Sequence, residues 1–141
     1  MARPRAITLA PPARIRFVAQ QHGHGDCAVA ALAMLCGVDW PTAFAAFDNP
    51  ASVLKEGVAP WAAFRRAAGR LGVMTRIKRK PNLAGDTGIL FCTEIDGPDG
   101  HAAFLWEGRI IDGDGRCYLS AHEYLDCRAF VSHSLLARKI L

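Results

Sequence analysis

Residues 21–27 read Gln-His-Gly-His-Gly-Asp-Cys and run directly into the apolar segment Ala28–Val38. Two glycines loosen the backbone ahead of Asp26, which is a favourable helix N-cap residue. We therefore predict a helix from Cys27 to about Cys36 that ends at Gly37. Ala, Val, Leu and Met lie on all sides of this helix, which indicates that other elements surround it. The remainder of the chain is expected to pack around this helix.

Length and composition favour one globular domain. The chain has 141 residues, of which 51% are hydrophobic and 21% are charged, as is typical of a folded protein with a single core. No apolar run reaches the roughly 18 residues that a membrane span needs. Residues 1–16 are basic and contain prolines but no apolar block like that of a secretion signal. We expect a flexible basic lead-in over 1–16, a single domain over 17–141 and a cytoplasmic location.

Cysteine spacing and net charge argue against a disulfide framework, a structural zinc site and nucleic-acid binding. The chain contains no C-x-x-C pair, so neither a disulfide framework nor a structural zinc site is indicated; the five cysteines are Cys27, Cys36, Cys92, Cys117 and Cys127. The net charge is +4, and the basic residues fall mainly in the lead-in and in Arg65–Lys80. Few aromatic residues are interleaved with them, so we interpret them as a solvated face and expect no nucleic-acid partner.

Helices are predicted to fill the first half of the domain. Asp39 is expected to cap a second helix over Pro41–Phe47, with residues 48–50 (Asp-Asn-Pro) as its stop. A third helix is predicted over Pro60–Leu71, ending at Gly72. Its apolar stripe is expected to be core and consists of Trp61, Phe64, Ala67 or Ala68, and Leu71.

A period of two then replaces the helical pattern. Val73–Lys78 alternates as a strand with one basic face, 81–88 reads as a loop, and Ile89–Ile95 is apolar on both faces, as expected of a central strand. Residues 96–100 are a turn, and two strands over His101–Trp106 and Arg109–Asp112 form a hairpin about Glu107-Gly108. A capping box at Ser120 starts a short helix to about Cys127, and Ala129–Leu136 is a last strand. Helices followed by an antiparallel sheet make an α+β domain.

Cys27 is the first candidate for chemistry. A cysteine attacks as the thiolate, and a helix N-terminus beside an imidazolium favours that form. His101 is the preferred base among the five histidines, because it opens a strand after a glycine-rich turn and leads toward two acids. With Glu107-Gly108 as a two-residue turn, His101 would lie opposite Asp114 and diagonal to Asp112. Either aspartate would orient the imidazole, as a catalytic triad requires.

Gln21 completes the constellation. Its side-chain amide is placed to donate to an oxyanion together with the backbone N–H of Cys27, and Gln20 is the neighbour that would replace it if the register differs by one residue.

These residues resemble the papain-like cysteine peptidases. The resemblance rests on Gln-x5-Cys at the start of a helix, on 25–34 (Gly-Asp-Cys-Ala-Val-Ala-Ala-Leu-Ala-Met), on the Gly100-His101 strand and on 110–112 (Ile-Ile-Asp). The sequence of these segments is most similar to that of the bacterial peptidases that trim double-glycine leaders from bacteriocin precursors. This similarity covers most of residues 18–115. The resemblance implies a papain-like fold with Cys27 as nucleophile, His101 as general base and acid, Asp112 as the orienting acid and Gln21 in the oxyanion hole.

The sequence therefore predicts a cysteine peptidase that hydrolyses a peptide or protein amide bond without a metal or organic cofactor. Acyl transfer, as in transglutaminase-like proteins, is the alternative within enzymes, because those proteins also order Cys, His and Asp in this way. The alternative that is not an enzyme is a binding module that kept the fold and lost turnover. Its basic strand over Arg76–Lys80 would then bind an acidic partner. His22 and His24 with Cys27 lack a fourth metal ligand nearby, and 112–115 (Asp-Gly-Asp-Gly) reads as a tight turn more than as a calcium loop.

Overall fold

The computed structural model describes residues 17–21, 26–56, 60–94, 100–127 and 130–138. Within them, helices come first: α1 (Cys27–Cys36), α2 (Trp40–Ala46), α3 (Pro50–Glu56) and α4 (Trp61–Arg70). The strands follow: β1 (Thr75–Lys78), β2 (Thr87–Glu94), β3 (Gly100–Trp106), β4 (Arg109–Ile111), β5 (Cys117–Tyr118) and β6 (Phe130–Arg138). Helix α5 (Ala121–Cys127) lies between β5 and β6 in the chain. The expected α+β class is confirmed.

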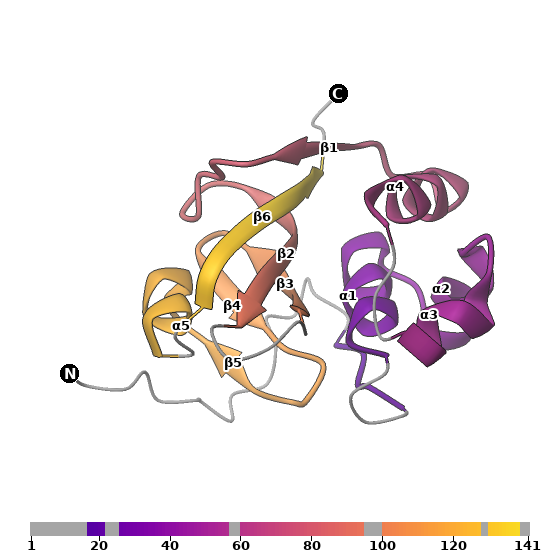
Figure 1. Ribbon diagram of the computed structural model, residues 1–141, viewed down its shortest axis with the longest axis horizontal. Helices are drawn as coiled ribbons and strands as arrows, with labels where there is room; N and C mark the ends of the chain where they lie inside the picture. The colour runs from indigo at the N-terminus through magenta and orange to yellow at the C-terminus, as the bar shows by residue number, and fades with distance from the viewer. Residues whose placement is uncertain (1–16, 22–25, 57–59, 95–99, 128–129, 139–141) are drawn as a thin grey trace.

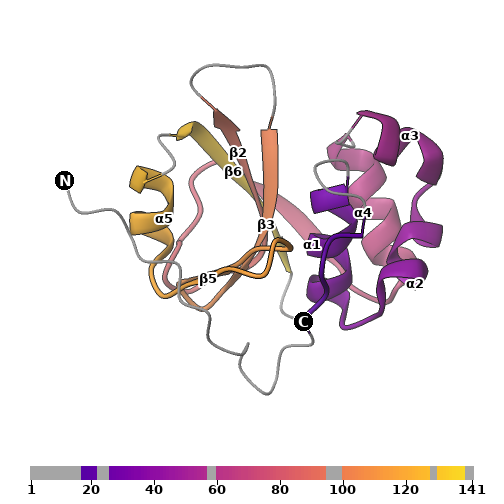
Figure 2. The same ribbon diagram turned by 90° about the horizontal axis from the view of Figure 1, so that it is seen from below.

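The strands form one antiparallel sheet in the order β1-β6-β2-β3-β4-β5. Strand β2 pairs with β3 on one side and with β6 on the other, which confirms the central strand that two apolar faces predicted. Helices α1 to α4 gather on one side of the sheet and α5 lies on the other (Figure 1, Figure 2). Each face of the sheet therefore has its own helical cover.

Helix α1 forms over the predicted residues and is the centre of the helical layer. Every residue from Cys27 to Leu35 is buried, and Gly37 ends the helix in the left-handed conformation with φ 68°. Asp26 occupies the predicted N-cap position, but its side chain makes no capping hydrogen bond. Its carboxylate binds donors outside the helix instead.

Helices α2 and α4 form where they were predicted. The Asp39 carboxylate accepts a hydrogen bond of 2.9 Å from the Thr42 backbone N–H and caps α2. Phe64 on α4 is fully buried, with edge-to-face ring contacts to Phe47 at 5.2 Å and to Phe91 of β2 at 4.9 Å between centroids. This aromatic contact joins the helical layer to the sheet. It agrees with the prediction that the apolar stripe of α4 is part of the core.

Residues 48–50 were predicted only as the end of the second helix. The structure has a further helix, α3, that begins there. Asn49 Oδ1 accepts a hydrogen bond of 3.4 Å from the Ser52 N–H, and Pro50 begins the helix. Proline fits the first turn because its missing N–H would have no partner there. The same residues that end α2 therefore start the next helix.

Four strands also differ from the prediction by two residues or more. Strand β2 begins at Thr87, inside the predicted loop over 81–88. Strand β1 begins at Thr75, two residues late, and Ile77 is exposed because β1 is an edge strand. Strand β5 was not predicted, since its two residues are too short to show a period. Strand β6 runs to Arg138, beyond the predicted end at Leu136. The predicted lead-in over 1–16, Ile95 and most of the turn at 96–100 lie outside the described residues.

The predicted hairpin is confirmed in register, with Trp106 opposite Arg109 and Phe104 opposite Ile111. Glu107 and Gly108 have φ of 47° and 82°, as a two-residue hairpin turn requires. Strand β4 ends at Ile111, so the predicted position of Asp114 opposite His101 is wrong. Asp112 and Asp114 lie instead in a tight turn closed by hydrogen bonds from Asp112 N to Arg116 O and from Gly115 N to Asp112 O.

Within the described residues, no single helix is both long and apolar enough to cross a membrane; α1 and α2 meet the criterion only as a pair bent by 103°.

Candidate functional site

Cys27 is the first residue of α1 and is buried, with 4% of its surface exposed. Helix α1 packs against β3, the strand that carries His101. A residue in the first helical turn lies at the positive end of the helix dipole, which favours a negative charge on its side chain. The local structure therefore meets the first requirement for a nucleophilic thiol.

His101 and Asp112 are in direct side-chain contact. His101 Nε2 lies 2.6 Å from Asp112 Oδ2, and the side chains are 19% and 1% exposed. His101 is near the start of β3 and Asp112 directly follows β4, so the hairpin register brings the two together. A buried carboxylate this close fixes both the orientation and the tautomer of the imidazole.

The Cys27 thiol also hydrogen-bonds the His101 imidazole. Burial of the ring lowers its pKa. The hydrogen bonds that the ring makes with Asp112 and Cys27, together with the charges of these groups, outweigh this effect and raise the pKa of His101 to about 10. The imidazolium is thus the favoured form at neutral pH. Because Nε2 is engaged by Asp112, Nδ1 is the ring nitrogen left to face the thiol.

Asp112 is held by two further donors. Tyr124 Oη donates to Asp112 Oδ2 at 3.3 Å, and the Asp114 backbone N–H donates to Oδ1 at 3.2 Å. Tyr124 lies on α5 and is fully buried. Sequence reasoning missed it, although a tyrosine on a short amphipathic helix needs a partner for its hydroxyl when it is buried.

Asp114 does not reach the imidazole. It is exposed, and its carboxylate accepts a hydrogen bond of 2.9 Å from the Arg116 backbone N–H. Of the two aspartates that the sequence left open, the structure therefore brings Asp112 to His101.

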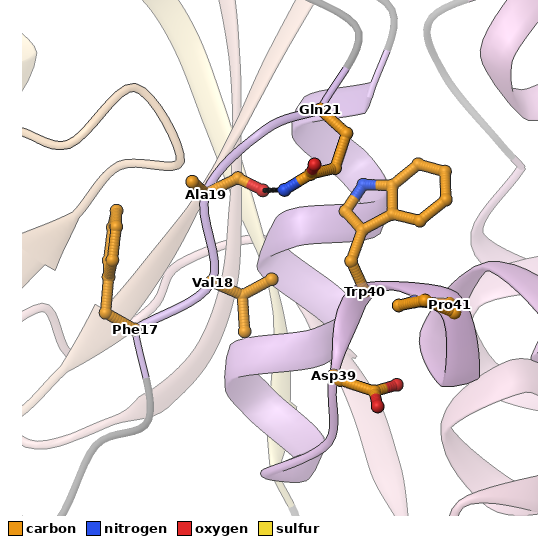
Figure 3. A pocket seen from close by; sticks show the side chains of 7 residues that line it. All are labelled: Phe17, Val18, Ala19, Gln21, Asp39, Trp40 and Pro41. Atoms are coloured by element: carbon orange, nitrogen blue, oxygen red, sulfur yellow. Dashed lines mark hydrogen bonds between the residues drawn. The ribbon is translucent and has the colours of Figure 1, made fainter.

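Gln21 lies near the head of α1, and its side-chain amide is bound by a backbone carbonyl of its own segment. Its side-chain Nε2 donates to Ala19 O at 3.1 Å (Figure 3). Its backbone N–H donates to Asp26 Oδ2 at 2.5 Å. The backbone of Gln21 is thus fixed near Cys27, and its exposed side chain must rotate before it can contribute to an oxyanion site.

Gln20 is tied to the opposite side of the site. Its backbone N–H donates to Gly113 O at 2.9 Å. A Cβ at Gly113 would lie 2.7 Å from Gln20 Cγ and 2.9 Å from the Ala30 Cβ, so the half-buried Gln20 side chain and α1 both pack closely against the turn that carries Asp112. The two glutamines therefore differ in freedom: Gln20 is packed and Gln21 is exposed.

A pocket of about 440 Å³ lies alongside α1, next to Gln21 (Figure 3). Its walls come from the segment before the helix and from the start of α2; the lining residues are Phe17, Val18, Ala19, Gln21, Asp39, Trp40 and Pro41. The Trp40 indole N–H donates to Asp26 Oδ2 at 2.7 Å. The same carboxylate that binds Gln21 therefore also fixes one wall of this pocket.

Burial affects two of the other thiols. Burial raises the pKa of Cys36 to about 12 and also raises the pKa of Cys117, which keeps both as inert thiols at neutral pH. The Cys127 side chain lies outside the described residues.

Among the residues that the structure describes, no group of three or more His, Cys, Asp or Glu side chains is arranged to hold a metal ion. His22 and His24 fall outside that part of the chain, and His122 is exposed on α5.

Comparison of the chain with family models, curated proteins and solved structures found no match. The resemblance to papain-like peptidases thus rests on the residues quoted from the sequence.

Proposed function

We propose that this chain is a cysteine peptidase of papain-like type that hydrolyses a peptide or protein amide bond. The observation that carries the proposal is the meeting of Cys27, His101 and Asp112, which come from α1, β3 and the turn after β4. A thiol, an imidazole that it hydrogen-bonds and a buried carboxylate behind that imidazole are the groups that nucleophilic acyl chemistry requires.

In the proposed reaction the Cys27 thiolate attacks the carbonyl carbon, and the negative charge moves to the carbonyl oxygen. The C–N bond breaks when the His101 imidazolium gives its proton to the leaving amine, which leaves a thioester on Cys27. His101 then takes a proton from water, the hydroxide attacks the thioester, and the acid and the thiolate separate. Asp112 keeps the imidazole aimed at the sulfur throughout. A cytoplasmic location is part of this proposal, because the thiol must stay reduced.

The oxyanion is assigned to the backbone N–H of Cys27 and the side-chain amide of Gln21. Gln21 serves this role after its amide leaves Ala19 O. Its exposure makes that rotation cheap, whereas Gln20 is packed against Gly113. Loss of one such donor slows acyl transfer by about 10²-fold to 10³-fold in other enzymes. Gln21→Ala should therefore slow turnover more than Gln20→Ala does.

The proposal is tested with a pool of internally quenched peptides that includes Gly-Gly sites. Wild-type protein should cleave at least one member, and Cys27→Ala should reduce this cleavage by at least about 10³-fold because no thiolate remains. Cys36→Ala is the matched control, since it makes the same change further along α1, and it should retain turnover. Failure of the wild type to cleave any member, or equal cleavage by Cys27→Ala, would contradict the proposal.

Hydrolysis and acyl transfer are separated by the products. The same assay is run with an added primary amine, and the products are identified by mass. A free carboxyl group at the cleaved bond supports hydrolysis, while incorporation of the amine in its place supports the transferase alternative.

A further inference from the structure

Asp26 is a buried carboxylate directly before the nucleophile. The residue is 0% exposed, and its Oδ2 accepts hydrogen bonds from two groups: the Gln21 backbone N–H at 2.5 Å and the Trp40 indole N–H at 2.7 Å. Its side chain makes no capping hydrogen bond to α1. A carboxylate kept from water needs such partners, because an unpaired buried charge is costly. Asp26 therefore connects the head of α1 to the preceding segment and to α2.

The segment that Asp26 holds is also bound from the other side. Gln20 N donates to Gly113 O at 2.9 Å, and the Gln20 side chain packs against Gly113. Residues 20 and 21 thus lie between the carboxylate next to Cys27 and the turn next to Asp112. Gln21 is the residue of this pair whose side chain is exposed and faces the pocket (Figure 3).

The hydrogen bonds of Asp26 Oδ2 reach the Gln21 backbone and the Trp40 ring. A contribution of Asp26 to acyl chemistry through these bonds would come from the groups that its oxygen holds in place.

We propose that Asp26 is a positioning residue, which fixes the backbone of Gln21 so that the Gln21 amide and the Cys27 N–H meet at the oxyanion. The inference rests on the proposed function. It assigns to Asp26 an effect on the stabilisation of the oxyanion and none on the formation of the thiolate, which belongs to His101 and Asp112.

Two reactions of Cys27 separate these effects without knowledge of the natural substrate. With p-nitrophenyl acetate the sulfur attacks the carbonyl carbon, passes through an oxyanion, forms S-acetylcysteine and releases p-nitrophenolate. With iodoacetamide the sulfur displaces iodide at a CH₂ carbon, and no oxyanion forms. The first rate needs both the thiolate and the oxyanion donors, whereas the second needs only the thiolate.

The variants are Asp26→Asn and Asp26→Ala, and both rates are measured at Cys27 by mass spectrometry. Asp26→Ala should slow acetylation by about 30-fold to 100-fold and leave alkylation within about threefold; this is less than the loss of a donor itself, because the Gln21 amide is still present but no longer positioned. Asp26→Asn retains an oxygen that can accept from Gln21 N, so its loss should be about tenfold or less. If Asp26→Ala does not fold, Asp26→Asn is judged alone, by a selective loss of at least about threefold in acetylation.

A double variant adds a second criterion. In the Gln21→Ala background the amide that Asp26 positions is absent, so Asp26→Ala should slow acetylation by less than about threefold further. Asp86→Asn is the control: Asp86 is a partly buried carboxylate that, like Asp26, accepts a backbone N–H, from Asn82 at 2.8 Å. It also pairs with Lys78, and it lies on the loop before β2. Both of its rates should equal those of the wild type.

Parallel loss of acetylation and alkylation in the Asp26 variants would overturn the inference, because it would indicate a general disturbance of the thiol. No loss of acetylation, or full additivity with Gln21→Ala, would overturn it as well. If instead the wild-type Cys27 is acetylated no faster than Cys36, the proposed function itself fails, which is a separate result from the effect of Asp26.

Discussion

Asp112 is the residue at which three parts of the molecule meet. Its Oδ2 contacts His101 Nε2 at 2.6 Å and the Tyr124 hydroxyl at 3.3 Å, while its Oδ1 accepts the Asp114 N–H. With 1% of its surface exposed, the carboxylate has little water to compete for these bonds. The orientation of the imidazole therefore depends on donors from α5 and from the turn after β4.

Tyr124→Phe should lower turnover by about threefold to tenfold, because Asp112 loses one neutral donor but keeps His101 and the Asp114 N–H. The measurement is kcat on a cleaved peptide. Tyr118→Phe is the matched control, since its ring contacts that of Tyr124 at 4.7 Å but its hydroxyl is not the one bonded to Asp112. Equal effects of the two changes would show that packing alone is involved.

The raised pKa of His101 predicts a pH dependence of stability. The folded value is about 10 and the ordinary value is 6.5, so the folded state binds the proton more tightly. This contribution is fully present below pH 6.5, falls as the pH rises, and is gone above about pH 10. The advantage of wild type over His101→Gln in urea unfolding should shrink across this window. A difference that grows with pH would contradict the assigned ion pair, and His122→Gln, at an exposed histidine, is the control.

Among the individual residues of the site, the sequence predicted those whose neighbours are determined by a local pattern. Cys27 follows from a helix start, and the pair of His101 with an aspartate follows from the register of a tight hairpin. Tyr124 and Asp26 could not be assigned, because their partners are reached through the packing of α5 and α2. The choice between Asp112 and Asp114 also needed the turn, which ends β4 at Ile111.

Among the elements, the turn at 112–116 depends on close packing to α1. Gly113→Ala would place a Cβ 2.7 Å from Gln20 Cγ and 2.9 Å from the Ala30 Cβ. We expect a loss of about 1–3 kcal/mol in the free energy of unfolding, since a methyl group must be forced between packed elements. Urea unfolding measures it, and turnover should fall as well because Asp112 is adjacent.

Gly69→Ala makes the same change on α4, where nothing lies within 4 Å of the added carbon. Alanine in an open helical position should raise the free energy of unfolding by about 0.5–1 kcal/mol. A loss at Gly69, or no loss at Gly113, would contradict the described packing.

Elements with a strong period were predicted well, and short ones were not. Helix α1, the stripe of α4 and the β3–β4 hairpin follow from spacing and turn residues. Helix α3 was missed because 48–50 (Asp-Asn-Pro) fits both a helix stop and a helix start, and the packing of Val53 decides the choice. Strand β5 is defined only by its pairing with β4.

At the scale of the whole molecule, the candidate site lies at the junction of two layers. The helical layer supplies Cys27, β3 supplies His101 and the turn after β4 supplies Asp112. Tyr124, which bonds the carboxylate, comes from α5, and α5 lies on the other side of the sheet from α1 (Figure 2). The proposed chemistry therefore exists only when the layers are packed, and loss of the fold should remove the advantage of Cys27 over the other thiols.

The assignment of Cys27 as the nucleophile is tested by the order in which the thiols react with one equivalent of iodoacetamide at neutral pH. Mass spectrometry identifies the labelled cysteines. Cys27 should be labelled at least about tenfold ahead of Cys36 and Cys117, whose pKa values are raised by burial. The preference should disappear in His101→Gln and in urea. Equal labelling of all thiols, or none at Cys27, would contradict the account.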